Sequence, residues 1–182
     1  VVAVWDPTDT GAQPRGKQVN DPKGIWYTPV TGIWQTVWLE VLPAVHVRTL
    51  TIPPDFDGGR VAVRPWMQGP SVAFTGADVI VRAGGQIVAQ TKITEYNTAA
   101  ELTLPHPRAW SPDDPFLYDL EVTLRAGESV DTVRSYFGLR KVERRRAADG
   151  YDRIFLNNRP VFMIGPLDQG WWPDGLYTAP TD

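Results

Sequence analysis

Residues 78–92 read DVIVRAGGQIVAQTK, two short runs with an apolar centre on either side of a glycine pair. Short apolar runs rich in β-branched residues and bounded by turn residues are typical of β-strands. Gly84 and Gly85 lack a Cβ and can therefore adopt the positive φ angles that a two-residue hairpin turn requires. The stretch predicts an antiparallel hairpin made of strands 78–83 and 86–92.

The same pattern continues on both sides of this hairpin. Short runs rich in β-branched and aromatic residues recur at regular spacing between turn residues, which is typical of an antiparallel sandwich. The further predicted strands are 45–52, 60–66, 100–104, 117–125 and 129–139. The proline-rich stretch 106–118 cannot be a central strand, because proline has no backbone donor. We expect it to cross between strands with Trp110 against the core. The predicted fold class is all-β, an immunoglobulin-like antiparallel β-sandwich.

Composition limits the partners. The chain has 182 residues, 42% of them hydrophobic, and a formal net charge of −3, so its overall field does not favour nucleic acid or anionic membranes. No apolar run approaches the roughly 20 residues that cross a bilayer. We therefore predict no nucleic-acid and no membrane partner. The absence of cysteine excludes disulfides and thiolate ligands but leaves the compartment open.

The N-terminal flank has a different texture. Residues 1–5 and 33–42 are predicted strands, separated by the Pro/Gly/Asp-rich connection 6–30. A connection of that length is often functional. The strand 33–42 is apolar on both faces, with Trp34 and Trp38 on one of them, as expected for a strand covered on two sides. The chain begins without Met or a signal peptide, and we expect it to be a fragment.

The C-terminal flank begins with a basic stretch, RKVERRRAADG at 140–150. Such a stretch can bind nucleic acid, but a solvated strand end or a domain junction is the simpler interpretation. The following residues, RIFLNNRPVFMIG, predict a hairpin around Asn157 and Asn158, because asparagine tolerates left-handed backbone.

Three motifs, in order along the chain, carry a family resemblance. Gly32–Glu40 (GIWQTVWLE) resembles the last strand of the jelly-roll sugar-binding domain of family 2 glycoside hydrolases, the group of β-galactosidases, β-glucuronidases and β-mannosidases. Tyr136–Glu143 (YFGLRKVE) resembles the close of their immunoglobulin-like domain, and Phe155–Phe162 (FLNNRPVF) resembles the hairpin that leads into their (β/α)8 barrel. The resemblance covers nearly the whole chain.

This resemblance implies three parts: 1–43 as the C-terminal part of the jelly roll, 44–142 as the sandwich, and 143–182 as the hairpin and an incomplete barrel. It places the first barrel strand at Val161–Ile164 and makes Trp34 and Trp38 core and interface residues rather than a sugar-stacking platform. Since the missing complements of both flanks leave apolar surface exposed, we expect the fragment to self-associate.

The resemblance also implies an activity. Family 2 enzymes are retaining hydrolases whose two catalytic glutamates lie on later barrel strands, the acid/base following an Asn. No Asn-Glu dipeptide occurs in this chain, so we expect no catalytic residue in it and no activity. The sandwich is then a spacer in a parent enzyme that hydrolyses terminal β-glycosides, with galactosides and glucuronides as the leading substrates. A free-standing carbohydrate-binding or adhesion module is the alternative.

Two segments are candidates for contact with the sugar in the parent. Residues 165–175 follow the predicted barrel strand, and active sites of this fold lie at the C-terminal ends of its strands. Asp168 and Gln169 are candidate hydrogen-bonding groups, with Trp171 or Trp172 as an apolar wall. Alternatively, Asp168 caps a turn and the tryptophans cover the barrel bottom or an interface. The loop 6–30 adds the weaker candidates Lys17, Gln18 and Asp21, for which a merely structural loop is the preferred alternative.

Substrate identity cannot be transferred from relatives at this position. Many of them have GVN, a basic residue and HE, where this chain has Gly165–Gly170 (GPLDQG). Metal and cofactor motifs do not appear. His46 and His106 lie sixty residues apart without ligand spacing, and DFDGG at 55–59 lacks the spacing of a calcium loop. We predict no metal and no cofactor.

Overall fold

The computed structural model describes residues 1–170, 172 and 174–181. They form two compact units, Val41–Ile164 on the one hand and Val1–Glu40 with Gly165–Asp182 on the other. Each unit is described by itself. Among the described residues, no helix has the length and hydrophobicity to span a membrane.

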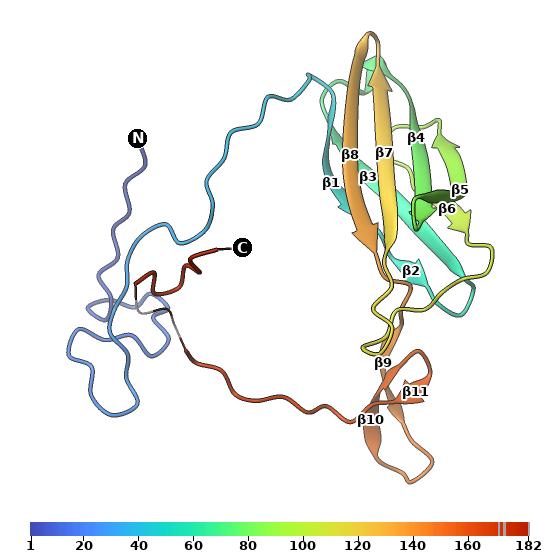
Figure 1. Cartoon of the computed structure of the whole chain (residues 1–182). Helices are drawn as coiled ribbons and strands as arrows, with labels where there is room; N and C mark the ends of the chain where they lie inside the picture. The colour runs from blue at the N-terminus through green and yellow to red at the C-terminus, as the bar shows by residue number, and fades with distance from the viewer. Residues whose placement is uncertain (171, 173, 182) are drawn as a thin grey trace. The chain divides into compact units, whose positions relative to one another are not determined.

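The larger unit contains two four-stranded antiparallel sheets (Figure 1). In the first sheet, β3 (Arg60–Gln68) pairs with β1 (His46–Thr51), β2 (Pro54–Asp55) and β6 (Ala100–Thr103). The second sheet has the order β5 (Gln86–Ile93), β4 (Phe74–Ala83), β7 (Tyr118–Ala126) and β8 (Ser129–Phe137). A single turn of 3-10 helix, η1 (Ser71–Ala73), precedes β4. The predicted sandwich is confirmed, and sequence analysis missed only the two-residue strand β2.

The hairpin at the centre of the prediction is also confirmed. Ala83 pairs with Gln86 across the turn, and Gly84 and Gly85 have φ angles of 56° and 82°. Both glycines have open space where a Cβ would lie, so the turn needs them for their backbone angles and not for packing.

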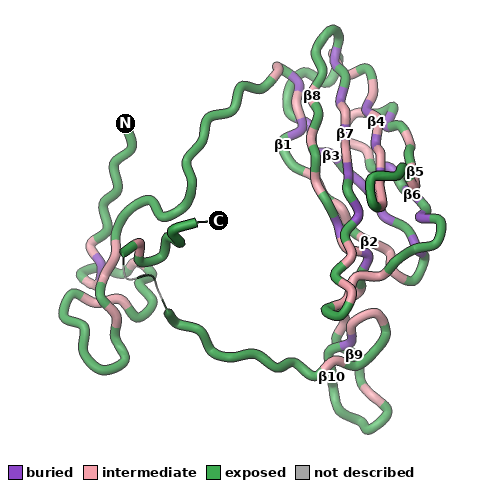
Figure 2. Tube along the Cα trace, in the orientation of Figure 1, coloured by how far each residue is buried: buried purple, intermediate pink, exposed green. Residues whose placement is uncertain are grey.

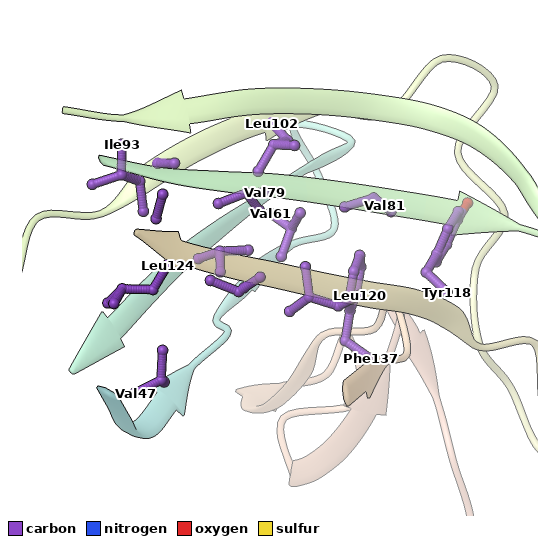
Figure 3. Packing of buried hydrophobic residues seen from close by; sticks show 14 of the residues in the cluster. Val47, Val61, Val79, Val81, Ile93, Leu102, Tyr118, Leu120, Leu124 and Phe137 are labelled. Atoms are coloured by element: carbon purple, nitrogen blue, oxygen red, sulfur yellow. The ribbon is translucent and has the colours of Figure 1, made fainter. Parts of the chain in front are cut away.

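Strand alternation builds the core between the two sheets (Figures 2 and 3). Every second residue of β7 is buried, from Tyr118 to Ala126. These side chains pack with those of β3 and β4 in one cluster that includes Val61 and Val79. Full burial of a large aliphatic side chain contributes roughly 1.5–3 kcal/mol, so the alternating strands supply most of the stabilisation of this unit.

The proline-rich crossing is held to the sandwich by side chains. The Tyr118 hydroxyl accepts a hydrogen bond from the Arg108 backbone N–H at 2.7 Å, and the Tyr118 ring stacks on Phe137 with centroids 5.2 Å apart. The Trp110 backbone N–H donates to the Leu139 carbonyl at 3.0 Å. The Trp110 side chain lies so close to Gly138 that a Cβ on Gly138 would be 3.0 Å from it. The expected contact of Trp110 with the sandwich is confirmed.

The larger unit also contains a three-stranded sheet of β9 (Val142–Arg146), β10 (Asp152–Leu156) and β11 (Arg159–Pro160). Asn157 and Asn158 form the predicted turn between β10 and β11, with φ angles of 50° and 66°. Their side chains also bind the sandwich. Asn157 accepts from the Lys141 N–H at 3.0 Å and donates to the Trp110 carbonyl at 2.9 Å, and Asn158 donates to Asp57 at 2.7 Å.

The basic residues around β9 form ion pairs within this unit. Arg144 lies 3.3 Å from Asp152, Arg145 lies 3.3 Å from Glu143, and Lys141 lies 2.7 Å from Asp57. This pairing favours a solvated strand at a junction over a nucleic-acid surface.

Three predicted strands are wrong for this chain. Residues 1–5, 33–42 and 161–164 have no regular strand structure. A strand needs a neighbour whose N–H and C=O groups it can pair with, and the described residues supply none for these segments. Their side chains are consequently exposed (Figure 2): Trp38 is 70% and Leu39 92% accessible. Trp34 and Trp38 are therefore not core residues in this chain.

Candidate functional site

The loop 6–30 folds back on itself through a close pairing of two of its parts. Gln18 forms an isolated parallel bridge with Tyr27, supported by hydrogen bonds from the Tyr27 N–H to the Lys17 carbonyl at 2.8 Å and from the Val19 N–H to the Tyr27 carbonyl at 3.2 Å. This pairing holds the side chains of Lys17 and Tyr27 next to each other, with the ammonium nitrogen 5.9 Å from the ring centroid.

Carboxylates shape the start of this loop. Asp6 accepts from the Thr8 N–H at 2.8 Å and from the Thr31 hydroxyl at 3.4 Å, and Thr8 is buried with a φ angle of 58°. The Asp9 carboxylate accepts from the backbone N–H of Asn20 at 3.2 Å. Asp6 thus caps its own turn through Thr8, as Asp commonly does, and both acids tie the start of the loop to residues further along the chain.

The segment that begins at Gly165 forms a second set of turns. Trp172 and Leu176 form an antiparallel bridge, with N–H to carbonyl distances of 2.8 and 3.0 Å. Upstream of this bridge, Asp168 accepts from the Gly170 N–H at 2.8 Å. The Asp168 carboxylate thus caps a turn, which is the alternative that the sequence left open.

The two segments meet in the same compact unit. The side-chain oxygen of Gln169 accepts from Lys17 Nζ at 3.3 Å and from the Tyr27 hydroxyl. Gln18 donates to the Tyr177 hydroxyl at 3.1 Å, and Thr178 donates to the Trp34 carbonyl at 3.2 Å. These contacts join residues at least 142 positions apart in the sequence. The two stretches selected from sequence as sugar-contacting candidates are therefore neighbours.

A cleft of about 460 Å³ lies in this unit, with walls from both segments. Its polar and charged lining includes Asp6, Arg15 and Gln18, and its aromatic lining is Trp34 and Tyr177. The volume falls within the usual range for a small-molecule site. Aromatic faces beside hydrogen-bonding groups suit a small polar ligand that also has an apolar face.

Sequence analysis did not select four of these lining residues. Asp6, Arg15 and Tyr177 belong to turn-rich stretches without a motif, and Trp34 was assigned to packing. The only signal for the loop residues was the unusual length of the connection. The position of Tyr177 depends on a contact between distant segments, which no local pattern reveals.

The other predicted site residues have different surroundings. Asp21 forms an exposed ion pair with Lys23 at 2.8 Å. Trp172 is half exposed and is held by its bridge to Leu176. Trp171 lies outside the described residues. Contact of any of these residues with a sugar stays a prediction. Within the described part of the chain, no three side chains of His, Asp or Glu are grouped so as to hold a metal ion.

The family model for glycosyl hydrolases family 2 matches residues 45–140, the two sheets of the sandwich. The chain belongs to this family. The family resemblance is thereby confirmed, although the motifs at Gly32–Glu40 and Phe155–Phe162 lie outside the matched residues.

The relatives of this family 2 chain are glycosidases. It is 30% identical over 151 residues to a β-galactosidase of Rhizobium meliloti, a match that covers 78% of the chain and 19% of the relative. It is 25% identical over 179 residues to a β-galactosidase of Thermoanaerobacter pseudethanolicus, covering 88% of the chain and 24% of the relative. The chain thus spans a quarter or less of the length of these curated relatives.

Solved structures of β-glucuronidases share the fold. A β-D-glucuronidase of Dictyoglomus thermophilum matches with a TM-score of 0.55 and 22% identity, over 68% of this chain and 19% of that one. A β-glucuronidase of Ruminococcus gnavus in complex with C6-substituted uronic isofagomine matches with a TM-score of 0.57 and 21% identity, over 76% of this chain and 22% of that one. At this identity the match establishes the fold alone.

Proposed function

We propose that this chain is an internal part of a retaining glycoside hydrolase that cleaves terminal β-glycosides, with galactosides and glucuronides as the leading substrates. Residues 1–43 contribute to its jelly roll, 44–142 form the sandwich, and 143–182 begin its catalytic barrel. The sandwich is a non-catalytic spacer between the outer domains. Relatives named β-galactosidase and neighbours named β-glucuronidase support both substrate classes.

One observation carries the proposal beyond family membership. The segment that begins at Gly165 and the loop 6–30 are hydrogen-bonded to each other through Gln169, and other residues of the two stretches, among them Gln18 and Tyr177, line one cleft. A substrate site assembled from the loop of one domain and the rim of the next requires this meeting. The cleft supplies hydrogen-bonding groups and aromatic walls, as a sugar requires.

The same unit is expected to be inert by itself. Retaining hydrolysis requires two carboxyl groups about 5–5.5 Å apart on either side of the scissile bond. The carboxylates of Asp6 and Asp168 instead accept hydrogen bonds from backbone N–H groups of their own turns, and that of Asp9 accepts from the backbone N–H of Asn20. In the proposal, the catalytic pair comes from barrel residues that follow this chain.

Exposed apolar side chains support the expected self-association of the chain. Val37, Leu39 and Val41 are 71–95% exposed along one segment, and Phe162 and Ile164 are more than 80% exposed along another. Large exposed apolar surfaces are unusual on monomeric soluble proteins. Sedimentation velocity at two protein concentrations tests the association, and a concentration-independent monomer contradicts it.

Hydrolysis assays test the proposed activity. The full-length polypeptide that contains this chain is expected to cleave p-nitrophenyl β-galactoside or p-nitrophenyl β-glucuronide, whereas the 182-residue chain cleaves neither. Calorimetric titration of the chain with galactose and glucuronate is expected to show no binding at millimolar sugar concentration. A millimolar Kd requires a binding free energy of about 4 kcal/mol, and only part of the site is present in this chain. Millimolar or tighter binding by the chain alone would instead support a free-standing carbohydrate-binding module.

A further inference from the structure

The side-chain amide of Gln169 is held by two donors from the loop 6–30. Its oxygen accepts from Lys17 Nζ at 3.3 Å and from the Tyr27 hydroxyl. The two donors are held next to each other by the 2.8 Å hydrogen bond from the Tyr27 N–H to the Lys17 carbonyl. The Lys17 ammonium also lies over the Tyr27 ring in a cation–π contact. Gln169 therefore meets a prearranged pair of donors.

This arrangement determines which end of the amide points away from the loop. A primary amide oxygen accepts two hydrogen bonds, and Lys17 and Tyr27 provide both. A lysine ammonium donates only, so a flipped amide would place the NH2 group of Gln169 against another donor. The NH2 group has no hydrogen-bond partner within the described residues, and Gln169 is exposed. It is the part of this side chain that is available to a ligand.

Gln18 provides an internal contrast. Its oxygen accepts from the Val30 N–H at 3.2 Å and its NH2 group donates to the Tyr177 hydroxyl at 3.1 Å. Both ends of that amide are used in holding the unit together. Of these two glutamines, Gln169 is the one that keeps a free hydrogen-bonding group.

We infer that Lys17 and Tyr27 are positioning residues that lock the Gln169 amide so that its NH2 group donates to an oxygen of the bound sugar. The inference rests on the proposed function and deepens it. Gln169 then selects a sugar oxygen that accepts a hydrogen bond, and the loop acts on the substrate only through Gln169. Lys17 and Tyr27 need no substrate contact of their own.

A double-mutant cycle on the full-length polypeptide tests this coupling, with kcat/KM for p-nitrophenyl β-galactoside and p-nitrophenyl β-glucuronide as the readout. Loss of one neutral hydrogen bond to the substrate lowers kcat/KM by about threefold to tenfold, so this is the decrease expected for Gln169→Ala. Lys17→Met and Tyr27→Phe are expected to lower it less. In the Gln169→Ala background, neither change is expected to lower it further.

Two more variants separate positioning from general structural support. Lys17→Arg retains a donor and is expected to restore most of the activity lost in Lys17→Met. Gln169→Glu keeps an acceptor oxygen for Lys17 and Tyr27 but replaces the NH2 donor by a second acceptor oxygen, and is expected to lose at least as much activity as Gln169→Ala. Lys92→Met and Tyr136→Phe, at exposed positions of the sandwich, are the matched controls and are expected to leave kcat/KM unchanged.

The outcomes are distinguishable. If Lys17→Met and Tyr27→Phe lower kcat/KM by the same factor with Gln169 present or absent, the inference is overturned and the proposed function stands. If Gln169→Glu retains full activity, the donor role of the NH2 group is overturned. If the wild-type polypeptide cleaves neither glycoside, the proposed function fails, and the inference fails with it.

Discussion

Replacing Tyr118 with Phe removes one hydroxyl from the edge of the sandwich core. Tyr118 is only 3% accessible. A phenylalanine at this position retains the ring that stacks on Phe137. The change therefore deletes only the 2.7 Å hydrogen bond to the Arg108 N–H. A hydrogen bond of this type contributes about 1 kcal/mol net, and water can reach the exposed Arg108, which keeps the cost near that value. We expect a loss of about 1 kcal/mol in unfolding free energy, or roughly 4 °C in Tm.

Equilibrium unfolding in urea, monitored by far-UV circular dichroism, measures this loss. The signal reports on the larger unit, because all the named strands lie between His46 and Pro160. Tyr136→Phe is the control, since Tyr136 is exposed and its change is expected to cost less than about 0.5 kcal/mol. Hydrogen exchange of the Arg108 amide is expected to accelerate only in Tyr118→Phe. Equal unfolding midpoints for the two variants, or an unchanged Arg108 exchange rate, would refute the reasoning.

Two further predictions concern the backbone and charge of the same unit. Gly69→Ala is expected to cost clearly more unfolding free energy than Gly84→Ala, because a Cβ on Gly69 would lie 2.2 Å from the Ala44 carbonyl, whereas that on Gly84 meets open space; equal midpoints in urea would contradict this. The hydrogen bond from Lys141 lowers the pKa of Asp57, so its stabilisation is present at neutral pH and is lost as pH falls through the folded pKa. The stability gap between wild type and Asp57→Asn is expected to close below about pH 4, and a constant gap would exclude the linkage.

The hairpins show how much of the fold is local information. Gly84 with Gly85, and Asn157 with Asn158, occur where the backbone must take positive φ, and these residue types meet that need without help from elsewhere. The alternation of apolar and polar residues along β7 likewise matches its alternation of buried and less buried side chains. Both features depend on neighbours in sequence, so they were predictable.

The segment 33–42 shows where the same reasoning fails. Its apolar, β-branched and aromatic residues suit a strand, but the described residues contain no strand to pair with it, and its side chains are exposed. Composition indicates that a segment suits a sheet and does not supply the partner that completes one.

The sequence by itself determined the strands and turns of the sandwich, its family, and the two stretches that are candidates for sugar contact. Only the tertiary structure decided that these stretches meet, that Gln169 lies between Lys17 and Tyr27, and that Asp168 caps a turn. The physical reason is the range of the interactions. Backbone angles and alternation are set by adjacent residues, whereas a hydrogen bond between residues 142 positions apart depends on the path of the whole intervening chain.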